Sequence, residues 1–124
     1  MILILQGGCS MIIRSDQMEY VTCTLNPNFT EGVCAKVLLP ADLLEDSPFR
    51  EVSWIELQPG SAVNEHAHEE QSEMKVIVGG FGVCVEEGVS TEVGAGDVIL
   101  TEKGVRHSIL NNGKHPLVYV AIRS

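Results

Sequence analysis

The chain has 124 residues, 44% of them hydrophobic, and it carries 8 basic against 17 acidic side chains, a formal net charge of −9. This length predicts one domain, and the apolar content is typical of a folded protein and not of a disordered one. The negative charge makes nucleic acid and anionic membrane surfaces poor partners, and no apolar run approaches the roughly 18–20 residues that a membrane span requires.

The first ten residues are predicted to lie outside the folded domain. The apolar start Met-Ile-Leu-Ile-Leu lacks the basic flank and the length of a secretory signal. Because Met11 could serve as a start in its own right, residues 1–10 are interpreted as a mis-assigned start or a floppy tail. We expect residues 11–124 to form a single domain.

The four cysteines, Cys9, Cys23, Cys34 and Cys84, show neither a Cys-x-x-Cys pair nor zinc-finger spacing. No export signal is recognisable at the start of the chain, so we interpret them as reduced thiols. This interpretation predicts a cytoplasmic protein.

Short runs rich in Val and Ile alternate with Gly-, Pro- and Asn-containing turns over most of the chain. The runs are too short for helices, and several show the period-2 alternation of strands. We predict strands at residues 20–25, 33–39, 52–57, 74–78, 81–85, 98–101, 108–110 and 117–122, and one helical turn at 41–46. Many short strands with such turns are typical of an all-β sandwich or barrel.

A His-x-His pair follows the turn at Pro59 and Gly60. On an extended strand, side chains two residues apart point to the same face, about 6.5 Å apart along the chain. The imidazoles of His66 and His68 are therefore predicted to converge on one ion. The alternative for any single histidine is a hydrogen-bonded residue of the core.

Glu73 and His107 are the other two candidate ligands. On one uninterrupted strand Glu73 would face away from the histidines, so we predict that the chain reverses at the polar segment 69–72. His107 begins a later run, after a turn at 102–104. Three imidazoles and one carboxylate suit a divalent Fe, Mn, Co, Ni or Zn ion and leave open the coordination positions that a catalytic site needs.

The segment Gly60-x5-His66-x-His68-x4-Glu73-x6-Gly80 resembles the first sequence motif of the cupin family. All of its elements, glycines included, fall in order at the family's spacings. A lone His-x-His would be a weak signal, whereas the complete pattern is specific.

The segment Gly96-x5-Glu102-x-Gly104-x2-His107-x3-Asn111 resembles the second cupin motif, with one departure. The family usually has proline where this chain has Glu102. That position sets a turn and is not a ligand, so the departure weakens the turn chemistry and leaves the metal site intact. Together the two motifs span residues 60–111, somewhat under half of the chain.

The resemblance implies a jelly-roll β-barrel of antiparallel strands. It places His66, His68, Glu73 and His107 on the family's metal positions and gives Asn111 a structural role. It further implies one divalent transition metal per chain and a homodimer, often with exchanged N-terminal strands. Some members have lost the metal, and the family's activities range over dioxygenases, isomerases, decarboxylases, lyases, sugar binding and regulation, so the motifs identify the metal cradle and not the reaction.

Three functions therefore remain open, and the first two have a small molecule as the partner. The chain could be a metalloenzyme acting on a hydroxy acid, keto acid or sugar derivative, with Glu73 as acid or base if it is not a tight ligand. It could instead bind or sense a sugar or carboxylate without turnover. The third alternative is a structural barrel with an incidental metal.

Two basic residues are candidates for substrate binding. Period-2 alternation puts Lys75 on the face of Glu73, where it would need an ion-pair partner or an anionic ligand, unless a bulge reverses the register. Arg50 could orient a carboxylate at the barrel mouth through a bidentate contact, or it could be an ordinary surface arginine. Trp54, close by, is expected in the core.

Overall fold

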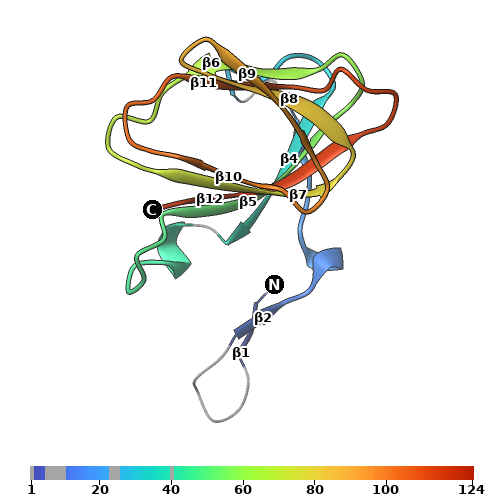
Figure 1. The fold of residues 1–124 in the computed structure, drawn as a ribbon. Helices are drawn as coiled ribbons and strands as arrows, with labels where there is room; N and C mark the ends of the chain where they lie inside the picture. Colours follow the sequence, from blue (N-terminus) through green and yellow to red (C-terminus); the bar gives the residue numbers. More distant parts are fainter. Residues whose placement is uncertain (1, 5–10, 23–25, 40) are drawn as a thin grey trace.

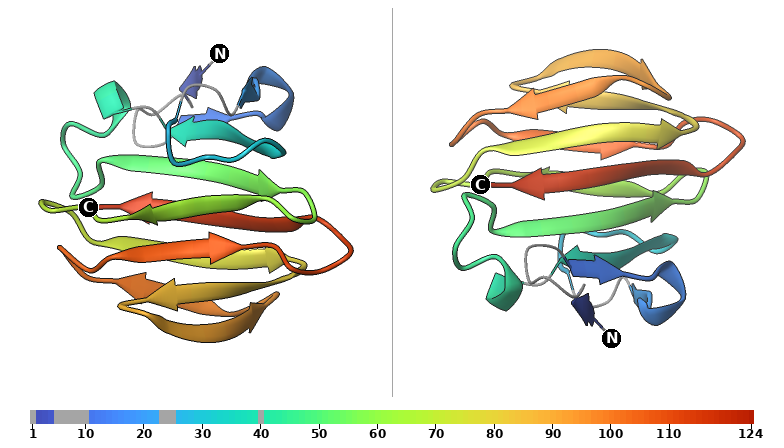
Figure 2. Two further views of the ribbon diagram at one scale, coloured as in Figure 1. Left: turned by 90° about the horizontal axis from the view of Figure 1, so that it is seen from above. Right: turned by 90° about the horizontal axis from the view of Figure 1, so that it is seen from below.

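Antiparallel strands in two facing sheets build the molecule, as the computed structural model shows for residues 2–4, 11–22, 26–39 and 41–124 (Figure 1). The larger sheet has the strand order β10-β7-β12-β5-β4-β3, and the smaller has the order β6-β11-β8-β9. Seen from below, β12 lies in the middle of the larger sheet between β7 and β5 (Figure 2). This is the predicted all-β jelly-roll barrel.

The strands of the larger sheet are β3 (Val21–Thr22), β4 (Val33–Leu39), β5 (Glu51–Leu57), β7 (Glu73–Gly79), β10 (Val98–Thr101) and β12 (Leu117–Arg123). Those of the smaller sheet are β6 (Ala62–His66), β8 (Phe81–Glu86), β9 (Val89–Gly94) and β11 (His107–Leu110). The described residues include 3-10 helices at Ser15–Gln17 and Ala41–Leu43, which lie outside the sheets, and the latter occupies the start of the helical turn predicted at 41–46. No helix among the described residues is long and apolar enough to cross a membrane.

Part of the predicted tail is itself a strand. The described part of that tail is β1 (Ile2–Ile4). It pairs antiparallel with β2 (Met11–Ile13), which follows the tail, in a separate two-stranded sheet. This strand pair extends away from the barrel on the side of the larger sheet (Figure 1). Cys9 and Cys23 lie outside the described residues, as do residues 24 and 25 of the first predicted strand.

The apolar core lies between the two sheets. Its largest fully buried side chains include Leu57, Ile77, Ile109, Leu117 and Tyr119, each at most 1% exposed. Trp54 is not among them, contrary to expectation. Because the inward positions of β5 are Ser53, Ile55 and Leu57, Trp54 points outward, where its indole N–H donates to Glu56 Oε2 at 2.9 Å.

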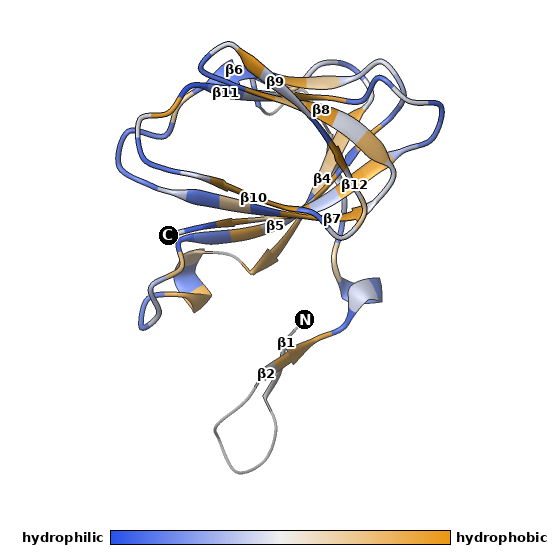
Figure 3. Cartoon of the chain, in the orientation of Figure 1, coloured by the Kyte–Doolittle hydropathy of each residue, from blue (hydrophilic) through white to orange (hydrophobic). Residues whose placement is uncertain are grey.

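The inner face of the larger sheet changes from apolar to charged along its strands. Cross-strand neighbours form successive rows: Leu57 with Leu117, then Ile55 with Tyr119 and Ile77, then Ser53 with Ala121 and Lys75, and finally Glu51 with Arg123 and Glu73. The strand ends beside the C-terminus are coloured hydrophilic in Figure 3. The core therefore fills one end of the barrel, and polar side chains line the other.

The turn between β7 and β8 requires the glycine that the first motif supplies. Gly80 has φ +81, and a Cβ built on it would lie 2.3 Å from the carbonyl oxygen of Pro116. Any other residue would be strained by its backbone conformation and would collide with the chain that leads into β12. Gly80 thus fixes the hairpin whose first strand, β7, carries Glu73 and Lys75.

Candidate metal centre

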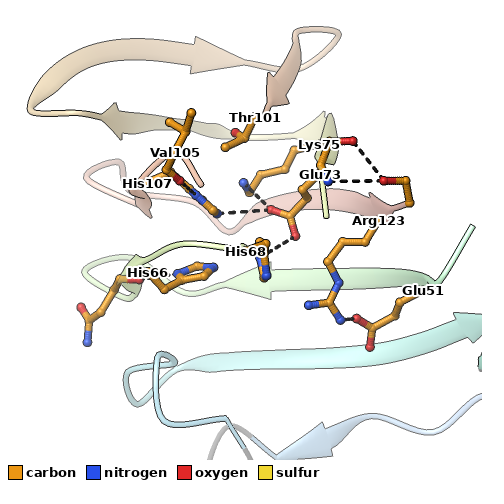
Figure 4. A network of polar contacts seen from close by, with 12 residues as sticks. Glu51, His66, His68, Glu73, Lys75, Thr101, Val105, His107 and Arg123 are labelled. Atoms are coloured by element: carbon orange, nitrogen blue, oxygen red, sulfur yellow. Dashed lines mark hydrogen bonds and ion pairs between the residues drawn. The ribbon is translucent and has the colours of Figure 1, made fainter. Parts of the chain in front are cut away.

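Three histidines converge at the polar end of the barrel (Figure 4). His66 is the last residue of β6 and lies opposite His107, the first residue of β11, in the antiparallel register of the two strands. The strand β6 ends at His66, so His68 lies in the following loop. The spacing of the two histidines had instead suggested that both lie on one extended strand. One ring nitrogen from each histidine lies within 4.8 Å of the others, close enough for all three to bind one ion.

Backbone carbonyls orient two of the rings. Nδ1 of His66 lies 2.7 Å from the carbonyl oxygen of Asn64, and Nδ1 of His107 lies 2.9 Å from that of Val105. Because a carbonyl only accepts, each Nδ1 carries a hydrogen, and in a neutral ring so oriented Nε2 keeps the lone pair. Metal-binding histidines are commonly held by this same kind of contact from the ring nitrogen that does not bind the metal.

Two of the Nε2 atoms are buried and find no hydrogen-bond partner among the residues that the structure describes. These are Nε2 of His68 and Nε2 of His107, the latter in a side chain that is 1% exposed. An unpaired buried polar atom costs on the order of 1–3 kcal/mol, so the fold alone gives no reason for two of them side by side. A divalent cation that accepts both lone pairs satisfies them, and the donor set of three imidazoles fits such a cation.

Burial keeps the histidines in the form that binds metal. Removal from water lowers the pKa of His66, and the nearby rings of His107 and His68 lower it further, against the opposing effect of the Asn64 carbonyl. Burial is also the main cause that lowers the pKa of His68. Both rings are consequently neutral at pH 7, as a ligand must be.

Glu73 is the first residue of β7 and is 8% exposed. It faces inward, as the predicted chain reversal requires. Its two carboxylate oxygens each lie 3.6 Å from an imidazole Nε2, Oε2 from His68 and Oε1 from His107. Burial alone would raise the pKa of Glu73, but its contacts with His107 and Lys75 outweigh that effect and lower the pKa to about 2. The carboxylate is therefore ionised and adjacent to the three-histidine cluster.

Lys75 points into the barrel, because the pairing of β7 with β12 is regular from Glu73 to Ile77 and shifts register only after Ile77. It is 3% exposed, and its Nζ lies 2.7 Å from Oε1 of Glu73. Of the alternatives set out for this residue, the structure shows the ion pair within the barrel. Lys75 is also one of the residues that line the cavity beside the histidines.

A cavity of about 180 Å³ opens beside the cluster. Among its lining residues are His66, His68, Glu73, Lys75 and Arg123, and other lining groups are Glu51, Ser53 and Tyr119. A ligand that fills so small a space has few heavy atoms. The cavity is well below the size of pockets that take drug-sized molecules.

The structure does not bring Arg50 to this cavity. Arg50 is exposed and lines a separate surface depression with Glu70 and Lys103. The arginine of the cavity is Arg123, which the sequence reasoning missed. Period-2 alternation could have found it, because Arg123 continues the buried positions Leu117, Tyr119 and Ala121 of the last strand.

Asn111 has the structural role that the family resemblance implied, and His115 follows it in the loop before β12. Asn111 is fully buried, and its amide nitrogen donates to the carbonyl oxygens of Leu57 and His115 at 2.8 Å each. Its Oδ1 accepts from the backbone N–H of Gly113 at 2.9 Å. Asn111 is thus a structural residue that ties the loop before β12 to β5, and the exposed side chain of His115 lies outside the cavity.

Comparison with known proteins gives one family model and several relatives. The Cupin_2 model, described as a cupin domain, matches residues 53–123. An oxalate-binding protein of Thermotoga maritima is 40% identical over 118 residues, which are 95% of this chain and 97% of that protein. The crystal structure of a predicted oxalate decarboxylase of Thermotoga maritima matches at 30% identity with a TM-score of 0.80, covering 91% of this chain and 97% of that one. A Cupin 2 conserved barrel domain protein of Salinispora arenicola is 26% identical with a TM-score of 0.69, over 93% and 89% of the two chains.

Proposed function

The chain belongs to the cupin domain family, and from that premise we propose that it binds one divalent transition metal and uses it to hold oxalate or a similarly small carboxylate. His66, His68 and His107 are the proposed ligands, with Glu73 as the fourth. The observation that carries the metal is the pair of buried, unpartnered Nε2 atoms on His68 and His107. When bound, the metal supplies a Lewis acid that attracts carboxylate oxygens.

The cavity and the relatives support the choice of ligand. A space of about 180 Å³ suits a ligand of oxalate size, and a relative with 40% identity is named an oxalate-binding protein. Lys75 is the proposed anion-binding group, because it supplies a positive charge in the cavity wall at 3% exposure.

Binding without turnover and catalysis on the same ligand are the two candidate functions. Because its contacts lower the pKa of Glu73 to about 2, this carboxylate is ionised near neutral pH and has no proton to donate in the free protein. That state favours a binding protein over an enzyme in which Glu73 acts as an acid. A structure of a predicted oxalate decarboxylase among the relatives keeps the enzyme as the second candidate.

Calorimetric titration of oxalate into manganese-loaded and into chelated protein tests this function. We expect one oxalate per chain in the loaded protein and at least about 10-fold weaker binding in the chelated protein, because the Lewis acid is gone. Because oxalate also chelates free metal, the metal content is measured again after the titration. Equal affinity with and without metal would contradict the proposal, and release of one formate and one CO₂ per oxalate, with uptake of one proton, would make the protein an enzyme.

A homodimer and a cytoplasmic location complete the proposal. Outward-facing residues of the larger sheet form two apolar rows across neighbouring strands: Leu100, Met74, Ile122 and Val52 in one, and Val98, Val76, Val120 and Trp54 in the other. Val98 and Leu100 are 57% and 63% exposed, and an apolar face of this extent is typical of a protein–protein contact. The cytoplasm is supported by Cys84, a buried thiol that forms no disulfide in the described part of the chain.

A further inference from the structure

Arg123 has a place in the cavity that the metal centre does not explain. On the inner face of the larger sheet it lies between two acidic residues, opposite Glu73 on β7 and opposite Glu51 on β5. Its side chain is 28% exposed and lines the same cavity as His66 and His68. The guanidinium is therefore at the ligand-binding end of the barrel, on the sheet that also carries Glu73.

The guanidinium has hydrogen-bond donors to spare. Its Nη2 is ion-paired with Oε2 of Glu51, as Figure 4 shows, and this is the one side-chain partner of Arg123 that the described residues provide. An arginine presents five N–H donors in a planar fork, and one carboxylate takes at most two of them along one edge. The remaining donors stay available to a carboxylate inside the cavity.

The charges in the cavity wall indicate how many negative charges a ligand carries. Within the described part of the chain the acidic and basic lining groups are Glu51, Glu73, Lys75 and Arg123, two of each sign. A divalent cation at the histidine cluster leaves this wall with an excess of two positive charges. A dianion cancels that excess, whereas a monocarboxylate leaves one positive charge uncompensated in a half-buried space.

We propose that Arg123 determines specificity for small dicarboxylates: the metal centre takes one carboxylate and the free donors of the Arg123 guanidinium take the second. This inference rests on the proposed function, because it needs a carboxylate held at the metal. Oxalate can also chelate a metal with both carboxylates, which acetate cannot do, so the contribution of Arg123 is the part of the selectivity for oxalate that is lost when the guanidinium is removed.

The test compares dissociation constants of oxalate and acetate in manganese-loaded wild type and in Arg123→Gln. We expect Arg123→Gln to weaken oxalate binding about 10- to 100-fold, the range for losing hydrogen bonds to a charged group, and to change acetate binding less than about 3-fold. Arg123→Lys retains the charge without the fork, so its loss for oxalate is expected to be smaller. Arg106→Gln is the matched control, because Arg106 is 57% exposed, pairs with Glu65 at 3.2 Å and lies outside the cavity.

Metal content and thermal unfolding of each variant are measured alongside, so that a damaged metal site is recognised. Suppose that both Arg123 variants hold full metal and show the same ratio of oxalate to acetate dissociation constants as wild type. That result would overturn the role of Arg123 and leave the proposed function standing. If loaded wild type binds no oxalate, the proposed function fails and this inference fails with it. If Arg123→Gln loses oxalate selectivity at full metal content and Arg106→Gln keeps it, the inference holds.

Discussion

Glu73 and Lys75 form an ion pair in a space from which water is largely excluded. Their side chains are 9% and 3% exposed, and the two charges lie 2.7 Å apart. Removing two charges from water costs several kcal/mol per ion, which only their mutual attraction and further polar contacts can offset. The pair is therefore a weak source of net stability, but each partner depends strongly on the other.

A double-mutant cycle in metal-free protein measures that dependence. Lys75→Met is expected to lower the free energy of unfolding by about 3 kcal/mol, because it leaves the Glu73 carboxylate buried without its counter-charge. Lys75→Met combined with Glu73→Gln should lower it by less than the sum of the single changes. Urea denaturation in the presence of a chelator provides the values.

The exposed pair of Arg106 and Glu65 is the control for this cycle. Both side chains are more than half exposed, so Arg106→Met should change the free energy of unfolding by less than about 1 kcal/mol. Strict additivity of Lys75→Met and Glu73→Gln would show that the two side chains do not act as a pair, contrary to the structure.

At the scale of elements, alternation predicted the strands that bury one face. The runs 33–39 and 98–101 coincide with β4 and β10. The run 52–57 misses the first residue of β5, 117–122 misses the last residue of β12, and 74–78 misses one residue at each end of β7. β9 (Val89–Gly94) was missed because, of its residues, only Val93 is buried. An edge strand that faces solvent shows no alternation of apolar residues that could predict it. The strand β9 forms because it pairs with β8.

The site was predictable in its residues and not in its geometry. The motif spacing identified the three histidines and Glu73, but the loop position of His68 depends on where β6 ends, which no local pattern marks. The convergence of His66 with His107 depends on the pairing of β6 with β11, two strands that lie about forty residues apart in the chain. Arg123 could have been found by alternation, whereas its pairing with Glu51 requires the neighbouring strand.

At the scale of the whole molecule, the outer face of the larger sheet is the proposed dimer contact. Light scattering after size-exclusion chromatography should give about 27 kDa, twice the 13.5 kDa of one chain. Val120 lies at the centre of one apolar row, so Val120→Lys should shift the mass toward 13.5 kDa by placing a charge in the contact.

The matched control is Val89→Lys, because Val89 is 66% exposed and lies on β9 of the smaller sheet. That variant should keep the mass of the wild type. A wild-type mass of 13.5 kDa at tens of micromolar protein would instead show that the apolar face is not covered by a second copy.

The metal centre is the central claim, and elemental analysis of the purified protein tests it most directly. After reconstitution, wild type and His115→Ala should each carry about one transition metal per chain, because the exposed His115 lies outside the cavity. His66→Ala and His107→Ala should lose it, since each removes one of three converging ligands. A metal-free wild type, or full occupancy in both variants, would contradict the three-histidine site.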